Sequence, residues 1–145
     1  MMTVSAPPDF SLENVGVKVP LWVSDFLLPL KVTPLDDGIN WQVLESFDFE
    51  SIILDRIIIV PEGFITDFAS IPRSLWTLVG GPTGKYTKAS CLHDYCYRTV
   101  HFCTKDQADH VLLEAMQLSK VDWLTMKEVY DGVRVGGASS YKGGL

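Results

Sequence analysis

The hydrophobic pattern of this chain changes once, from strand-like to helix-like, and that change sets the fold class. Over residues 17–32 and 41–49 β-branched and aromatic residues predominate, and residues 52–60 add a near-continuous apolar run. After Pro72 apolar residues recur instead at steps of three and four. The sequence therefore predicts an α+β fold, in which N-terminal antiparallel strands pack against a C-terminal helical hairpin plus one further helix.

The length of 145 residues is typical of one domain with a single core. Asp36-Asp37-Gly38 is expected to form the turn between the first two strands, and Pro61-Glu62-Gly63 is expected to end the sheet. We expect residues 1–145 to form one domain that consists of an extended arm (1–16), strands (17–62), a motif loop (63–84), helices (85–135) and a glycine-rich tail (136–145).

The helical half carries clear start signals. Thr104 and Gln107 match a capping box, so a helix is expected to begin there and to continue to about Ser119. The apolar spacing predicts an earlier helix over residues 87–97, a later one over 123–133, and weaker helical character over 74–78.

Composition excludes several classes of protein. The formal net charge of -6, with no cluster of Lys or Arg, argues against a nucleic-acid partner. No apolar stretch is long enough for a membrane-spanning helix, and the N-terminus has no secretory pattern, so we expect the protein to stay where it is made. Three cysteines in no metal or redox spacing are expected to be reduced and partly buried: Cys91, Cys96 and Cys103.

Spacing around the hairpin turn predicts a contact between His93 and Asp109. If the turn centres near His101, the two residues lie eight positions before and after it, at the same height in the hairpin. The Asp109 carboxylate would then accept a hydrogen bond from one ring nitrogen and leave the other free as a general base or metal ligand. The alternative is a purely structural pair, because buried polar groups need partners in any protein.

Neighbouring residues suggest further roles. Tyr97, one turn after His93, is expected to hydrogen bond an acid or to line a pocket. Asp94 projects about 100° away from His93 and suits a divalent cation, calcium or zinc, with carbonyls of the Gly80 to Gly84 loop as further ligands.

The loop after the last strand supplies the remaining candidates. Asp67 is expected to join the cation site, since strand-end loops often carry functional residues. The alternative is that Asp67, with Thr66 and Ser70, caps a short helix after Pro72 or pairs with Arg73.

Two blocks, 63–73 (GFITDFASIPR) and 93–98 (HDYCYR), resemble an uncharacterised family of tailed-phage and prophage proteins, domain of unknown function 1353. Ala108-Asp109 and Met116 fit the same pattern. The resemblance covers residues 32–136 and implies a phage origin without a known activity.

His93-Asp94-Tyr95-Cys96-Tyr97 also resembles the active-site helix of phospholipase A2. That resemblance implies a general base at His93, a calcium ligand at Asp94, an orienting carboxylate at Asp109, and a calcium loop at Gly81 and Gly84. This chain departs from that family in three ways: Ser90-Cys91 replaces a double cysteine, the disulfide framework is absent, and the β-rich first half has no counterpart.

Two hypotheses follow. In the first, the protein is a phage hydrolase in which His93, oriented by Asp109, activates water while Asp94 and Asp67 hold a cation, and the substrate is a lipid ester or a cell-wall amide. In the second, it is a structural virion protein of the tail or baseplate, which binds other phage proteins or itself. Either protein is expected in the host cytoplasm during synthesis, and the second also in the virion.

Overall fold

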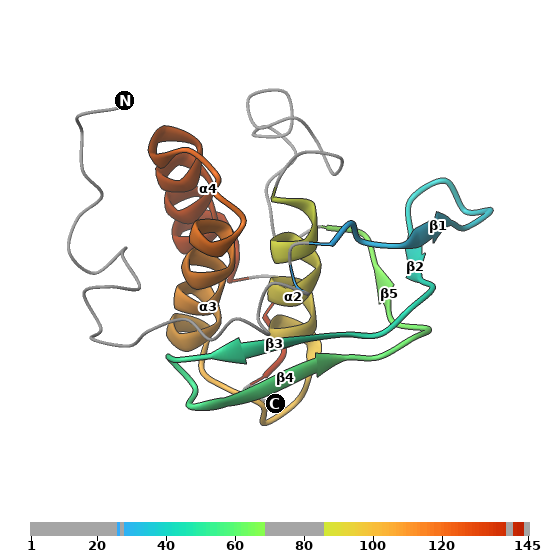
Figure 1. The fold of residues 1–145 in the computed structure, drawn as a ribbon, viewed down its shortest axis with the longest axis horizontal. Coiled ribbons are helices and arrows are strands. Elements are labelled where there is room, and N and C mark those ends of the chain that lie inside the picture. The colour runs from blue at the N-terminus through green and yellow to red at the C-terminus, as the bar shows by residue number, and fades with distance from the viewer. Residues whose placement is uncertain (1–25, 27, 69–85, 139–140, 144–145) are drawn as a thin grey trace.

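A computed structural model describes residues 26, 28–68, 86–138 and 141–143 of the chain. Within these ranges, two small antiparallel sheets precede three helices, which confirms the α+β prediction (Figure 1). No helix in these ranges is long and apolar enough to cross a membrane. The predictions for the arm (1–16), the first part of the first strand (17–25), the weak helix (74–78), Ser70, Arg73, Gly81 and Gly84 lie outside the described residues.

The smaller sheet consists of β1 (Val32–Pro34), β2 (Trp41–Val43) and β5 (Ile65–Thr66), in the order β1-β2-β5. The predicted turn between β1 and β2 is confirmed. The Asp37 carboxylate accepts hydrogen bonds from the backbone N–H groups of Ile39 (2.9 Å) and Asn40 (2.8 Å). Gly38 follows at φ +73°, a conformation that costs glycine little.

The second sheet pairs β3 (Phe47–Ser51) with β4 (Arg56–Val60). The prediction of one strand over 41–49 was wrong, because a bend at 44–46 divides it between the two sheets. Strand β4 begins at Arg56 rather than Ile52, since 52–55 form the hairpin turn with Asp55 at φ +52°. The chain also returns to the smaller sheet after Pro61-Glu62-Gly63 as β5, so the expected end of the sheet was wrong as well.

The helices agree closely with the sequence pattern. They are α2 (Thr87–Arg98), α3 (Lys105–Leu118) and α4 (Trp123–Gly136). The capping box at α3 is present: the Thr104 hydroxyl accepts from the Gln107 N–H (3.1 Å), and the Gln107 side chain accepts from the Thr104 N–H (3.0 Å). Asp122 caps α4 by accepting from the Thr125 N–H at 2.9 Å.

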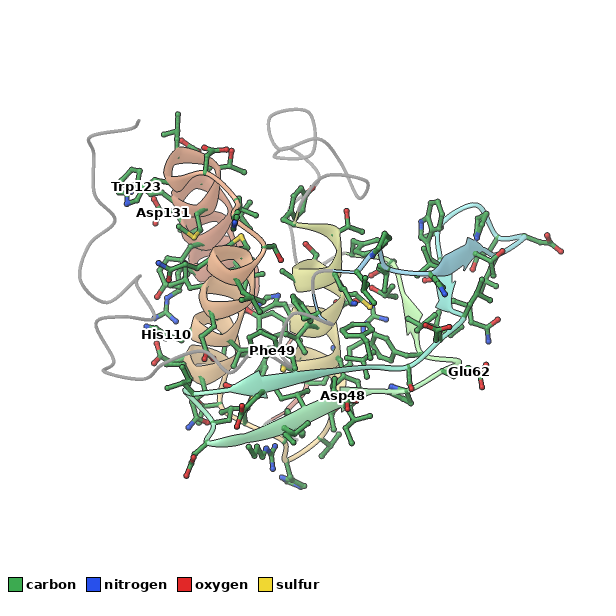
Figure 2. All side chains as sticks on the ribbon, viewed as in Figure 1. Asp48, Phe49, Glu62, His110, Trp123 and Asp131 are labelled. Carbon is green, nitrogen blue, oxygen red and sulfur yellow. The ribbon has the colours of Figure 1, made fainter. Side chains whose placement is uncertain are left out.

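The core lies between the helices and the inner face of the β3–β4 sheet. Alternation along the strands buries Phe49 and Ile58 and leaves Asp48 and Ile59 exposed. Figure 2 labels Phe49 and Asp48, which lie on opposite faces of the sheet. The helices contribute a continuous apolar set that includes Leu92, Val111, Leu112, Met116 and Val129.

A buried carboxylate joins α3 to the β3–β4 turn. Glu114 is 4% exposed, and its oxygens accept from the Ser51 hydroxyl (2.7 Å) and from the Ile52 N–H (2.7 Å). Burial raises the pKa of Glu114, while these hydrogen bonds oppose the rise. The contact holds the turn of the second sheet over the middle of α3.

We predict that Glu114→Ala lowers the free energy of unfolding by about 2–3 kcal/mol, because it leaves the buried Ser51 hydroxyl and the Ile52 N–H without their acceptor. Urea denaturation measures the loss. Glu62→Ala is the control: Glu62 is exposed, and its replacement should change stability by less than about 0.5 kcal/mol. Equal midpoints for the two variants would contradict the role given to Glu114.

Candidate active site

The predicted contact between His93 and Asp109 is present. His93 Nε2 of α2 lies 2.9 Å from Asp109 Oδ1 of α3, and both side chains are 0% exposed. The turn between the two helices contains His101 at φ +59°, which lets the chain reverse over a short distance. Equal spacing about the turn therefore does bring the two residues to the same height.

The Asp109 carboxylate accepts hydrogen bonds from four side chains of the described residues. Oδ1 receives the Tyr97 hydroxyl (2.6 Å) in addition to His93, which confirms that Tyr97 bonds an acid. Oδ2 receives Lys105 Nζ (2.9 Å) and Arg134 Nη1 (3.2 Å). The four donors come from all three described helices, so one carboxylate fixes their relative positions.

These donors decide the charge of Asp109. Burial alone would raise its pKa, but the hydrogen bonds from His93, Tyr97 and Lys105 outweigh burial and lower the pKa to about 2. The pKa of Tyr97 is raised by burial and by its bond to the carboxylate, so its hydroxyl keeps its proton. Asp109 is thus an anion throughout the neutral range.

An ionised carboxylate can only accept, and this fixes the state of the His93 ring. Nε2 must carry the proton that is donated to Asp109, so the neutral imidazole has its lone pair on Nδ1. His93 Nδ1 is buried and has no hydrogen-bond partner among the described residues. The same is true of Ser90 Oγ and Asp94 Oδ1, which lie three residues before and one residue after His93 on α2.

Asp94 belongs to a second polar cluster, on the side of α2 that meets β5. Its Oδ2 accepts from the Thr66 hydroxyl and lies 3.4 Å from Arg98 Nη2. The same Arg98 nitrogen pairs with Asp67, and Arg98 Nη1 donates to the Ile65 carbonyl at 2.9 Å. Burial raises the pKa of Asp94, and the Arg98 charge opposes the rise.

Helix α2 therefore contributes to two polar clusters. His93 and Asp109 form one cluster between the helices, while Asp67 and Asp94 meet at Arg98 beside β5, because adjacent residues on a helix point in different directions. Thr66 serves Asp94 and also accepts from the Phe68 N–H at 3.1 Å.

The proposed cation ligands are only partly described. Among residues 26, 28–68, 86–138 and 141–143, no three His, Cys, Asp or Glu side chains gather as a metal-binding group. Asp94 Oδ1 has no hydrogen-bond partner in the part of the chain that the structure describes, and it is a carboxylate oxygen of the kind that calcium prefers. Gly81 and Gly84 lie outside the described residues, so the metal site stays a prediction.

Three basic residues of these clusters were missed from the sequence. Lys105 lies four residues before Asp109, and Arg98 four residues after Asp94, so helical spacing could have indicated both. Arg134 comes from α4, and no local pattern relates it to Asp109. His110, which follows Asp109, bonds the Asp106 carbonyl through Nδ1 at 2.8 Å.

Comparison with known proteins identifies the family. A family model described as "Protein of unknown function (DUF1353)" matches residues 41–133, more than half of the chain. This chain belongs to the DUF1353 family. The match includes β2 to β5, the Asp94 cluster and the His93–Asp109 pair, and it ends one residue before Arg134.

A curated relative of this DUF1353 chain is the uncharacterized protein y4jT of Sinorhizobium fredii, which is 36% identical over 85 residues. The aligned part is 57% of this chain and 20% of that protein, so the chain spans about a fifth of its relative's length. No solved structure matches the chain.

The stability that Asp109 contributes and the stability that Asp94 contributes should depend on pH in opposite ways. Asp109 has a folded pKa of about 2, below the ordinary 3.8, so it contributes stability above pH 3.8 that is lost as the pH falls toward 2, on the order of 2 kcal/mol. Asp94 has a raised folded pKa, so its ionisation costs stability, and that cost disappears on acidification.

We therefore predict that the destabilisation caused by Asp109→Asn, relative to the unmutated chain, shrinks between pH 5 and pH 2.5. The difference in unfolding free energy between Asp94→Asn and the unmutated chain should change in the opposite direction over the same pH range. The reason is that the unmutated chain loses the cost of the Asp94 charge as the pH falls. Urea midpoints of the three proteins at several pH values test this. Parallel pH profiles would contradict the assignment of charge to Asp109.

Proposed function

We propose that this domain is a hydrolase of ester or amide bonds in which His93 is the general base. The observation that carries the proposal is the state of its ring: Nε2 is held at 2.9 Å by an ionised Asp109, and Nδ1 is a buried, unpartnered atom in the described part of the chain. Buried polar atoms normally have partners, so Nδ1 is the atom that a hydrolytic water would meet.

The reaction that we propose uses this lone pair. His93 Nδ1 takes a proton from water as the oxygen attacks the carbonyl carbon of the substrate, and a tetrahedral intermediate forms. The bond from carbon to the leaving oxygen or nitrogen then breaks, and the imidazolium returns the proton to the leaving group. Asp109 stabilises the imidazolium between these steps, and Tyr97 holds the carboxylate in place.

We include a divalent cation, calcium or zinc, in this proposal. Asp94 Oδ1 would bind it, with Gly81 and Gly84 as further ligands, and the cation would polarise the substrate carbonyl. Asp67 is a weaker ligand than the sequence indicated, because its Oδ1 already accepts from Arg98. The resemblance of residues 93–97 to phospholipase A2 supports this arrangement.

The substrate class that we propose is a lipid ester or a peptidoglycan amide, and the setting is a tailed phage or prophage. The likeness of the two sequence blocks to phage proteins supports this setting. The protein would then act in the host cytoplasm during phage synthesis or as part of the virion.

One observation favours the second candidate, a structural virion protein that binds other phage proteins or itself. His93 and Asp109 are 0% exposed, and Asp109 receives donors from all three described helices. Such a cluster can stabilise the packing of the helices and have no catalytic role. Replacing His93 should lower hydrolysis if the protein is an enzyme, and it should lower only the stability of the fold if the protein is structural.

We predict that His93→Gln lowers ester or amide hydrolysis at least about 100-fold, because general-base catalysis contributes factors of this size. Glutamine can still donate to Asp109, so the fold should persist. The assay follows a short-chain ester, phospholipid vesicles and peptidoglycan, and circular dichroism checks folding. His110→Gln is the matched control and should retain full activity.

A folded His93→Gln variant that hydrolyses as fast as the unmutated protein would refute the proposed base. If the unmutated protein cleaves none of the three substrates and His93→Gln only lowers the unfolding midpoint, the structural candidate takes its place.

Metal binding has its own test. We predict that isothermal titration with calcium or zinc shows a site whose affinity falls at least about tenfold in Asp94→Asn, through loss of the Oδ1 ligand. Asp131→Asn, on the exposed part of α4, should bind as the unmutated protein does. If the unmutated chain binds neither calcium nor zinc, the cation part of the proposal is refuted, and the role proposed for His93 is unaffected.

A further inference from the structure

One face of α2 carries buried polar atoms that have no hydrogen-bond partner among the described residues. They are the Tyr86 hydroxyl, Ser90 Oγ, His93 Nδ1 and Asp94 Oδ1. The Ser90 N–H donates to the Tyr86 carbonyl at 2.8 Å, so the helical spacing already holds at Tyr86, and residues three or four apart lie on the same face. Buried polar atoms nearly always have partners, so this group of exceptions indicates a place where a polar molecule binds.

Ser90 and His93 are the two that helix geometry brings together. They lie three residues apart, so their Cβ atoms are about 5–6 Å from each other. Side chains on a helix lean toward its N-terminal end, which directs the His93 ring over the turn that contains Ser90. Neither Ser90 Oγ nor His93 Nδ1 bonds the other, since both lack a partner in the described part of the chain. Two hydrogen bonds of about 2.8 Å through one water molecule span a gap of this order.

The side chains of α2 over which the His93 ring leans are small. Ala89, four residues before His93, has only a methyl group, and Ser90 adds one hydroxyl. The Tyr97 ring packs against the His93 ring, with 4.1 Å between centroids, and it comes from the following turn, on the C-terminal side. The side toward Ser90 is therefore the one from which a small molecule can contact Nδ1.

We propose that Ser90 and His93 together bind one buried water molecule, and that this water is the nucleophile of the proposed hydrolysis. The inference rests on that proposed function, because it concerns the water of the same reaction. The water donates one hydrogen to His93 Nδ1 and the other to Ser90 Oγ, which leaves an oxygen lone pair free to attack the substrate carbonyl. The first hydrogen passes to Nδ1 as a proton while the carbon–oxygen bond forms. Ser90 fixes the direction of the water and is not itself the nucleophile.

The first test compares high-resolution crystal structures of the unmutated full-length chain and of Ser90→Ala. We expect the unmutated chain to hold an ordered water within hydrogen-bond distance of both Ser90 Oγ and His93 Nδ1, and we expect Ser90→Ala to lose it. An unmutated chain without a water that contacts both atoms would overturn the inference. An identical water in the two structures would overturn the role of Ser90. Neither result affects the role proposed for His93.

The second test measures hydrolysis of whichever substrate the unmutated chain cleaves. Ser90→Ala should lower kcat at least about tenfold, because the water loses its orientation, while KM stays within about twofold. Ser90→Thr keeps the hydroxyl and should recover most of the lost rate. Ser46→Ala, at an exposed position between β2 and β3, is the control and should retain the full rate. Circular dichroism checks that each variant is folded.

The outcomes separate this inference from the function on which it rests. An unmutated chain that cleaves no substrate refutes the hydrolase and the role of the water together, whereas a folded Ser90→Ala variant that cleaves at the full rate refutes only the inference. A sulfonyl fluoride that modifies serine nucleophiles gives a further check on the unmutated chain. A label on Ser90 in the peptide map would overturn the inference, because Ser90 would then attack the substrate itself. The crystal structure and the labelling of the unmutated chain still decide if Ser90→Ala does not fold.

Discussion

The buried carboxylate of Asp109 is the interaction on which the described helices depend. An unpaired charge without exposure to solvent would be strongly unfavourable, so the fold must bring donors to it. Two come from α2, one from the first turn of α3 and one from α4. Because each donor needs a defined direction, this single anion sets how the three helices lie against one another and which nitrogen of His93 carries the proton.

Two more buried acids work in the same way on other parts of the fold. Asp94 joins α2 to β5 through Thr66 and Arg98, and Glu114 joins α3 to the β3–β4 turn through Ser51 and the Ile52 N–H. Apolar packing between the helices and the strands is adaptable, whereas these contacts are directional. Each of these two acids therefore fixes one helix to a different neighbour.

The helices could be predicted well because their signals are local. The Thr104–Gln107 capping box and the apolar steps of three and four gave the bounds of α3, and symmetry about His101 gave the His93–Asp109 contact. Strand bounds were less accurate. Whether 41–49 is one strand or two depends on which sheet each half joins, and this is decided by partners distant in the sequence.

The sequence by itself determined the α+β class, the helical hairpin, and the pairing of His93 with Asp109 and Tyr97, since a 3.6-residue period and a short turn place residues without reference to the rest of the chain. Only the tertiary structure decided that Arg134 pairs with Asp109 and that Arg98 pairs with Asp67. These contacts join separate elements, and their geometry follows from how helices and sheets pack rather than from any local repeat.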